Sequence, residues 1–323
     1  MFNTRNIAIQ YDQVPSQWIF QYYITLPEQL SGQNVKIKSV FNPTEKTPSM
    51  FIYYDGSQYK FKDFSTGLQG DGVYLVHKLH SLTLAQAFKL VIKDYNNYIM
   101  KNGKFVVENK PVAKWTIDYA EVRPFNQKDA DYWLQFRIGK SALDKYNIKA
   151  LSYYNAVKSQ DEHIDQFKVT DTCMYGYYTE SGELYKVYRP LNKKSKFFSI
   201  VSYIQGIDQL DYNKPYLVIC ASLKDALSLR SFGYNIEVIA PSSENSLIKP
   251  YVINNLKSKY KKIITLFDND DAGSRAIERY KELYDINGCS LDISKDISDA
   301  VRDYSFEEVH AKLKPLLKKT IYG

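Results

Sequence analysis

Cysteine is scarce in this sequence. Its 323 residues include three cysteines, Cys173, Cys220 and Cys289, and no pair of them forms a CxxC motif. This distribution argues against a disulfide framework and against a cysteine-based zinc site. It favours a reducing compartment, so we expect a cytoplasmic protein.

Long apolar runs and one phosphate-binding motif are also missing. No apolar run approaches the ~20 residues that span a membrane, and the polar start MFNTRNIAIQ lacks the pattern of a signal peptide. We therefore expect no membrane partner. The motif GxxxxGK[ST] does not occur, so we do not expect a P-loop helicase motor in this chain.

Basic and aromatic residues are plentiful. The chain has 43 lysines and arginines against 36 acids, a net charge of +7 and a pI of about 8.9. This balance favours an anionic partner such as nucleic acid, although a moderate excess is weak evidence. The 29 tyrosines offer surfaces for base stacking, but most tyrosines in proteins are half-buried packing residues.

The chain divides into three segments, which we place at 1–105, 106–211 and 212–323. Near the end of the first, Thr83 and Gln86 form a capping-box pattern ahead of an amphipathic helix. Asn102-Gly103 then predicts a hairpin-type turn at the boundary. The second segment mixes loops with the aromatic runs DYWLQFRI, MYGYYTE and LYKVYRP, which we interpret as strands of an α+β unit.

The third segment alternates regularly between apolar runs and amphipathic runs. This pattern predicts βαβ crossovers and a parallel sheet. The expected strands are 216–220, 236–240, 263–267 and a short one around Leu291, and the expected helices are 224–231, 247–259 and 274–283.

Acids follow these strands repeatedly. Because the carboxyl ends of parallel strands meet at one edge of a sheet, such acids can converge on one rim. Asp268 and Asp270 are two apart, which in extended chain places both on one side, where they can share a hard cation. The alternative for this pair is a solvated turn with an Asp N-cap. The acids at strand ends are Asp225, Glu244, Asp268, Asp270, Asp296 and Asp299.

The signatures FDNDDAG and KDISDAV, with this order of elements, resemble the Toprim domain of bacterial- and phage-type primases, topoisomerases and some nucleases. The resemblance covers about residues 212–302. It implies that Asp268 and Asp270 are carboxylates for Mg²⁺ or Mn²⁺ and that Asp299 is a further acid of the metal site. It also implies that Asp225 contributes to nucleotide binding.

One departure affects the expected chemistry. Toprim domains usually carry a glutamate and a glycine just after the first strand, where this chain has Ala221 and Ser222. We hypothesise that Glu244 supplies the missing catalytic carboxylate and metal ligand from the neighbouring strand end. Otherwise Glu244 caps the helix expected near Leu247, and the site has lost its activity.

The first segment is similar, over about residues 35–91, to the zinc-ribbon domain that precedes the polymerase domain of primases, including the EKTPS and GDG turns. The family's zinc ligands fall at Ser39, Asn42, Asp63 and Thr66. Zinc prefers thiolate and imidazole, so we expect no structural zinc. Aromatic packing would hold the unit instead, through Phe41, Phe51, Tyr59, Phe61 and Phe64. The resemblance implies template DNA contacts, for which the candidates are Lys36, Lys38, Lys46, Lys60 and Lys62, although exposed lysines are most often only solubilising.

The second segment carries a basic loop between aromatic residues, YKVYRPLNKKSKFFSI. A basic loop can clamp a polyphosphate that metal ions hold from the other side, whereas a charge run is more often a solvated loop. Similarity to the primase polymerase domain implies the first arrangement. The candidate nucleotide-binding residues are Arg189, Lys193, Lys194 and Lys196.

The sequence as a whole therefore predicts a mixed α+β and α/β protein with a ribbon-like β unit, a basic α+β subdomain and a Toprim Rossmann-like parallel sheet. The resemblance implies a primase that makes short RNA primers on single-stranded DNA from ribonucleoside triphosphates. A phage origin would place it in the host cytoplasm, and a separate replicative helicase is an expected partner. The alternatives are a Toprim nuclease and a non-catalytic single-stranded-DNA-binding replication protein.

Overall fold

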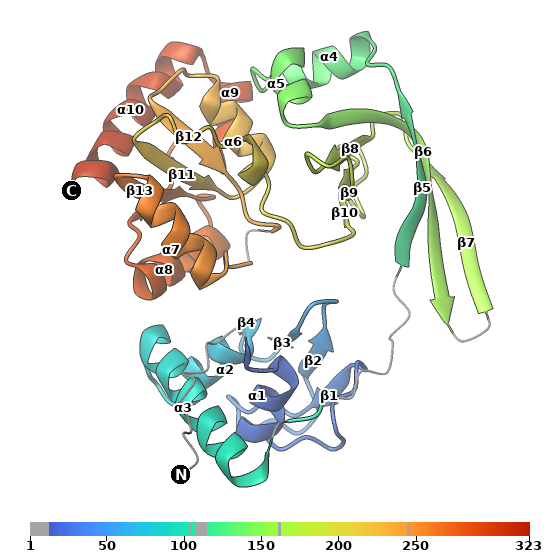
Figure 1. The fold of residues 1–323 in the computed structure, drawn as a ribbon, viewed down its shortest axis with the longest axis vertical. Helices are drawn as coiled ribbons and strands as arrows, with labels where there is room; N and C mark the ends of the chain where they lie inside the picture. Colours follow the sequence, from blue (N-terminus) through green and yellow to red (C-terminus); the bar gives the residue numbers. More distant parts are fainter. Residues whose placement is uncertain (1–12, 104, 108–114, 161–162, 244–245) are drawn as a thin grey trace, which may run out of the picture. The chain divides into compact units, whose positions relative to one another are not determined.

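The computed structural model describes residues 13–103, 105–107, 115–160, 163–243 and 246–323. The chain forms two compact units, Met1–Lys114 and Trp115–Gly323 (Figure 1). Both units combine helices with sheets, so the expected mixed α+β class is confirmed. None of the described helices has the length and apolar character needed to cross a membrane.

The first unit is built on an antiparallel sheet with the strand order β1-β2-β3-β4. The side chains of Met50, Ile52 and Phe61 are fully buried on one face of this sheet. Phe51 lies toward the other face, because successive strand residues alternate, and its ring contacts that of Phe64, with 5.6 Å between the centroids. The expected aromatic packing is present: Tyr59 and Phe61 are buried in the core, the ring of Phe41 packs on Phe61, and Phe64 packs on Phe51 although it is 62% exposed. The elements are α1 (Ser16–Tyr23), β1 (Val35–Ile37), β2 (Met50–Tyr54), β3 (Tyr59–Asp63), β4 (Gln69–Asp71), α2 (Gly72–Leu79) and α3 (Leu84–Asn102).

Helix α3 confirms one local prediction and corrects another. Thr83 and Gln86 form the expected capping box at its start. The expected hairpin turn at Asn102-Gly103 is wrong, because Asn102 is the last residue of α3 and Gly103 is its C-cap. Gly103 has φ +75°, a left-handed conformation that glycine adopts without steric cost.

The second unit begins with a six-stranded antiparallel sheet of order β10-β9-β8-β6-β5, with β7 also paired to β6. Strands β8 and β9 confirm the predictions for MYGYYTE and LYKVYRP. The prediction that DYWLQFRI is a strand is wrong, because Asn126 and Asp129 form a capping box that starts a helix. Trp133 is one of the buried residues of this helix. The elements are β5 (Trp115–Arg123), α4 (Gln127–Leu134), α5 (Lys140–Lys145), β6 (Ile148–Gln160), β7 (His163–Thr170), β8 (Tyr175–Tyr178), β9 (Leu184–Tyr188), β10 (Phe197–Ser199) and the 3₁₀ turn η2 (Ile207–Gln209).

The rest of the second unit is the expected parallel sheet, with the strand order β12-β11-β13-β14. The alternating strands and helices are confirmed, apart from shifts of their ends and an earlier position for the short last strand. The elements are β11 (Tyr216–Cys220), α6 (Leu223–Arg230), β12 (Ile236–Ile239), α7 (Pro250–Lys259), β13 (Lys262–Leu266), α8 (Asp271–Tyr284), β14 (Gly288–Cys289), α9 (Ile297–Asp303) and α10 (Phe306–Tyr322).

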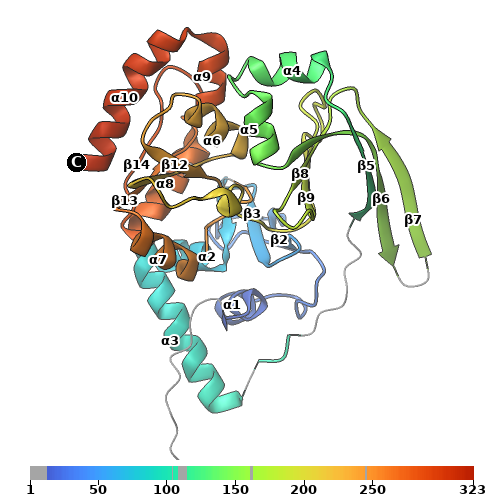
Figure 2. The ribbon, with the colours of Figure 1, turned by 45° about the horizontal axis from the view of Figure 1, so that its top comes forward.

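Helices cover both faces of the parallel sheet (Figures 1 and 2). Leu217 and Ile219 of β11 pack with α7 and α8 on one face. Val218 and Cys220 of the same strand pack with α6, α9 and α10 on the other face. Burial on both faces explains the continuous apolar runs of these strands.

One hydrophobic core joins the antiparallel and parallel sheets of the second unit. Trp133, Tyr175 and Tyr177 belong to the same buried cluster as Val218 and Leu227. Ser228 of α6 also donates a hydrogen bond to the carbonyl of Phe136, at 3.1 Å. This shared core positions the end of β9 relative to the carboxyl edge of the parallel sheet.

Candidate functional site

Three aspartates meet at the carboxyl edge of the parallel sheet. Asp225 lies in the first turn of α6, Asp268 lies just after β13, and Asp296 is the N-cap of α9. One carboxylate oxygen from each lies within 4.8 Å of the other two. Among the described residues this is the one group of at least three His, Cys, Asp or Glu side chains close enough to share a metal ion.

The environment of these carboxylates favours a bound cation. Asp225 and Asp268 are buried and Asp296 is partly buried. Burial, followed by the nearby charge of Asp296, raises the pKa of Asp225 to about 7. A cation would relieve this crowding of negative charge. The three side chains border a cavity of about 10 Å³, roughly the space of one water-sized sphere, and all their donor atoms are oxygens, which suit Mg²⁺.

Hydrogen bonds from the chain hold two of these carboxylates in place. Ser222 donates a short side-chain hydrogen bond to Asp225, and the Ser298 amide donates another at 3.3 Å. Asp296 Oδ1 accepts hydrogen bonds from Ser298 Oγ and the Asp299 amide, each at 2.7 Å. Ser222 and Ser298 therefore act as positioning residues for the acidic cluster.

A close backbone approach brings the start of α8 against Asp268. A Cβ atom built on Gly273 would lie 2.0 Å from the Asp268 carbonyl oxygen, so only glycine fits there. The glycine in DNDDAG is thus required by packing at the edge of the site.

The structure places Asp270 and Asp299, both predicted metal ligands, beside the three-aspartate cluster rather than within it. Asp270 is the N-cap of α8 and accepts hydrogen bonds from the Ala272 and Gly273 amides at 3.0 and 2.9 Å. The bond from Gly273 contributes most to lowering the pKa of Asp270. Asp299 forms an ion pair with Arg302 at 2.8 Å. Their metal roles stay predictions, and Glu244 lies outside the described residues.

Asp296 is one of the acids that follow the strands in the sequence, but the family resemblance does not assign it to the metal site. The sequence feature that could have identified it is the position of this acid in KDISDAV, immediately before α9. As the N-cap of that helix, its carboxylate points back toward the sheet edge. Lys295, the lysine of the same signature, was missed. Its Nζ lies 3.5 Å from Asp268 Oδ2 and 3.4 Å from Asp270 Oδ2, so it partly neutralises the rim.

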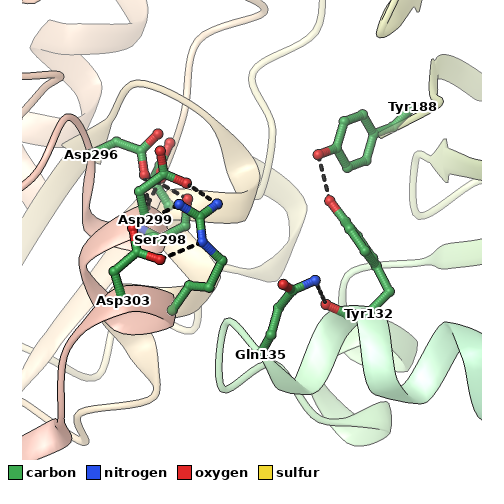
Figure 3. Close-up of polar contacts among 9 residues, drawn as sticks. Tyr132, Gln135, Tyr188, Asp296, Ser298, Asp299 and Asp303 are labelled. Carbon is green, nitrogen blue, oxygen red and sulfur yellow. Dashed lines mark hydrogen bonds and ion pairs between the residues drawn. The ribbon is translucent and has the colours of Figure 1, made fainter. Parts of the chain in front are cut away.

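An aromatic pair faces the acidic rim. Figure 3 shows the Tyr132 and Tyr188 hydroxyls, which are hydrogen-bonded at 2.6 Å, across from the start of α9 with Asp296 and Asp299. Burial raises the pKa of Tyr188 to about 12, and the charges of Asp225 and Asp296 add to the rise. Sequence reasoning missed this pair, because nothing in the separate helix and strand patterns places them together.

The predicted basic loop connects β9 to β10 as a hairpin. The Arg189 amide donates to the Lys196 carbonyl at 2.7 Å, and the Arg189 guanidinium donates to the Ser195 carbonyl at 3.0 Å. Lys193, Lys194 and Lys196 are exposed. The loop follows Tyr188 directly, so its base adjoins the residue that faces the acids.

In the first unit, all four positions that resemble zinc ligands take part in one hydrogen-bond network. Buried Asp63 accepts hydrogen bonds from Ser39 Oγ at 2.5 Å and from Thr66 Oγ1 at 2.7 Å. Ser39 Oγ in turn accepts from the Asn42 amide at 3.1 Å. Three hydroxyl or amide side chains and one carboxylate do not fit zinc, whose structural sites use thiolate and imidazole.

The lysines of the first unit gather around an aromatic face. Lys36, Phe51 and Lys62 lie opposite one another on β1, β2 and β3 and so share a face of the sheet. The Lys36 ammonium lies 5.1 Å from the Phe51 ring centroid, and that of Lys62 lies 4.8 Å from the Phe64 centroid. Lys38 and Lys46 are exposed, whereas Lys60 pairs with Asp55 at 2.7 Å.

Comparison with known families identifies one part of the chain. Residues 218–301 match the family of Toprim-like domains. The three-aspartate cluster thus lies within the segment that matches Toprim-like domains. No curated protein sequence matches the chain.

Several solved structures are similar at low sequence identity. The zinc-binding and RNA polymerase domains of the Aquifex aeolicus primase are 16% identical, with a TM-score of 0.44, and the match covers 96% of this chain and 85% of that one. The primase fragment of the bacteriophage T7 primase-helicase is 13% identical, with a TM-score of 0.37, over 86% of this chain and 98% of that one. A chain from the T7 lagging-strand polymerase structure with primase domains is 16% identical, with a TM-score of 0.34, over 58% of this chain and 87% of that one.

Proposed function

We propose that this protein is a DNA-directed RNA polymerase of the primase type, which makes short RNA primers on single-stranded DNA. The observation that carries the proposal is the convergence of Asp225, Asp268 and Asp296 at the carboxyl edge of a Toprim-like sheet. Oxygen ligands at such an edge suit a divalent cation that holds nucleotide phosphates.

The proposed reaction joins two ribonucleotides. The 3′-hydroxyl of one attacks the α-phosphate of the next, and pyrophosphate leaves. A bound Mg²⁺ or Mn²⁺ would neutralise charge on the phosphates and lower the pKa of the attacking hydroxyl. Asp225, Asp268 and Asp296 would hold that ion, while Asp270 and Asp299 line the same rim. Glu244 is predicted to supply a further catalytic carboxylate and metal ligand to this site.

Other residues have proposed binding roles. Lys193, Lys194 and Lys196 are exposed beside the Tyr188 end of β9, from which, with Arg189, they would clamp the triphosphate opposite the metal. In the first unit, Lys36 and Lys62 with Phe51 and Phe64 form a basic and aromatic face that suits single-stranded template DNA, because bases stack on rings while lysines meet phosphates. A separate replicative helicase is a proposed partner.

The deciding experiment supplies single-stranded DNA, labelled ribonucleotides and Mg²⁺ or Mn²⁺. Short, templated RNA is the expected product. Asp268→Asn and Asp296→Asn should each lower synthesis by a factor on the order of 10² or more, whereas Asp285→Asn, at an exposed acid that ends α8, should have no effect. Cleaved DNA without RNA would instead identify a nuclease.

A non-catalytic DNA-binding role is the second candidate, because a specific observation favours it. The position of the usual Toprim glutamate holds Ala221, which is buried and offers no ligand. If this candidate is correct, the wild-type protein binds single-stranded DNA but makes no RNA with either metal. Restored synthesis in Ala221→Glu would then show that the carboxylate alone had been lost.

A further inference from the structure

A second cavity lies in the same unit at the other end of α6 from Asp225. It has a volume of about 480 Å³ and is bordered by α4, α5 and the last turn of α6. Its lining combines the aliphatic side chains of Leu134, Ala142 and Leu227 with the guanidinium groups of Arg137 and Arg230. None of the three clustered aspartates borders it, so it is distinct from the metal site.

Arg137 occupies a position that normally belongs to glycine. It follows α4 with φ +58°, and its amide donates to the Leu134 carbonyl at 2.9 Å, which ends the helix. A left-handed conformation disfavours residues with a Cβ atom, and glycine is the usual choice at such helix ends. An arginine here carries a cost in backbone energy, so the contacts of its side chain are of interest.

Both arginines are held against aromatic rings. The guanidinium carbon of Arg137 lies 4.4 Å from the Phe306 ring centroid. That of Arg230 lies 5.8 Å from the Tyr146 centroid, and its Nη1 donates to the Tyr146 hydroxyl at 3.4 Å. Stacking fixes each guanidinium while leaving N–H groups for another acceptor.

Neither arginine forms an ion pair with a carboxylate in the described parts of the chain. Arg230 contributes a little to lowering the pKa of Asp211, but that carboxylate pairs with Lys145 at 2.8 Å. The cleft thus presents two oriented, uncompensated positive charges beside Leu134, which is 57% exposed. Anionic groups with an adjoining aliphatic group are the complement of this surface.

We propose that this cleft docks an acidic segment of a partner protein, with a leucine-sized side chain seated between carboxylates. The volume is within the range that holds a short peptide or a small molecule. A nucleotide fits less well, because the rings of Phe306 and Tyr146 are already covered by the arginines and the residues that line the cleft include no aromatic ring on which a base could stack. A carboxylate can accept two parallel hydrogen bonds from each guanidinium.

The test uses the full chain and a fluorescein-labelled decapeptide of aspartate and glutamate with one central leucine, measured by fluorescence anisotropy. Saturable binding that weakens with salt is expected. Arg137→Gly and Arg230→Ala should each weaken it at least tenfold. Arg137→Gly should keep or raise the melting temperature, because glycine relieves the left-handed backbone. Arg137→Lys, which keeps the charge without the planar fork, should also weaken binding.

Matched controls separate this site from general charge attraction. Arg275→Ala removes an exposed arginine on α8, on the opposite face of the sheet, and should leave peptide affinity unchanged. A peptide with glycine in place of leucine should bind at least threefold more weakly. RNA synthesis on bare template should be the same in all of these variants, which separates this proposal from the proposed catalytic function.

Three results would overturn the proposal. The first is equal peptide affinity in wild type, Arg137→Gly and Arg230→Ala. The second is an equal loss of affinity in Arg275→Ala, which would reduce the effect to net charge. The third is displacement of the peptide by ATP or inorganic phosphate at concentrations comparable to that of the peptide, which would assign the cleft to a phosphate ligand.

Discussion

At the scale of single residues, Asp63 takes over a position that resembles a zinc ligand. It is fully buried and joins the segment around Ser39 to the turn at Thr66. Burial alone would raise its pKa, but the hydrogen bonds from Ser39, Thr66 and Ser65 outweigh burial and lower it. A carboxylate held by several donors can tie two loops together in place of a metal.

We expect Ser39→Ala to lower the free energy of unfolding of the first unit by about 1 to 3 kcal/mol, because a buried carboxylate then loses a donor. The pKa of Asp63 is lower in the folded state than in the unfolded state. The ionised carboxylate therefore stabilises the fold above pH ~4, and this stabilisation is lost as the pH falls through the folded pKa. Urea unfolding at pH 7 and pH 3 measures both effects. Chelator should not change the melting temperature, and one tightly held zinc per chain in elemental analysis would contradict this view.

Lys186 is a second residue whose environment sets its chemistry. It is buried on β9, and its ammonium donates to the Ser242 carbonyl at 3.2 Å and to Gln205 Oε1 at 3.4 Å. Burial lowers its pKa from 10.5 to about 8. These two acceptors are neutral, so much of the cost of burying the charge remains.

We predict that Lys186→Met raises the free energy of unfolding at pH 7 by up to about 2 kcal/mol, because the folded state no longer buries a charge. The loss of the two hydrogen bonds makes this gain smaller. In the wild type the unfolded chain binds more protons than the folded one between pH 8 and 10.5, so stability should rise with pH there. The difference between variant and wild type should therefore shrink across that window. Thermal unfolding from pH 7 to 10 checks this, and a constant difference would show that the amine is not buried as a charge.

At the scale of elements, the strand-to-helix junction after β13 serves two purposes. Asp268 points into the acidic cluster, whereas Asp270 begins α8 by accepting from two amides. Both are predicted metal ligands, but only Asp270 also supports a helix. Substitutions of Asp270 can separate metal binding from helix capping.

Asp270→Ala should lower the free energy of unfolding by about 1 kcal/mol, the usual effect of losing an N-cap. Asp270→Asn should preserve stability, because asparagine caps nearly as well, while it removes the charge. If Asp270 binds metal, Asp270→Asn weakens Mg²⁺ or Mn²⁺ binding in calorimetry and abolishes primer synthesis. Unchanged metal affinity in Asp270→Asn, beside a clear loss in Asp296→Asn, would limit Asp270 to capping.

At the scale of the whole molecule, the chain consists of two units with separate cores. The core of Trp115–Gly323 runs from the antiparallel sheet into the parallel sheet. A division of this unit near residue 211, where we place a domain boundary, would expose Trp133 and Tyr175 on one side and Leu227 on the other. The two halves should therefore depend on each other for stability.

We predict that a fragment of residues 115–323 folds alone and unfolds in one cooperative transition, because its apolar clusters are complete. A fragment of residues 212–323 should be markedly less stable, since it loses the aromatic side of the shared core. Far-ultraviolet circular dichroism during urea unfolding compares them. Two separate transitions within residues 115–323 would show that the halves are independent.

The sequence by itself determined the features that depend on neighbours along the chain. The apolar runs predicted the parallel strands, and Thr83 with Gln86 predicted a capping box, because strand alternation and helix capping act over a few residues. The same local reasoning failed at DYWLQFRI, where the capping residue Asn126 lies ahead of the aromatic run and outweighs its strand propensity.

Only the tertiary structure decided which groups meet. Asp225, Asp268 and Asp296 follow three different elements, and their convergence depends on strand order and on the close approach that Gly273 permits. Sequence spacing does suggest that Asp268 and Asp270 act together, yet the α8 amides hold Asp270 beside the cluster. Side-chain direction follows from backbone hydrogen bonds and packing between distant segments, which a linear pattern does not encode.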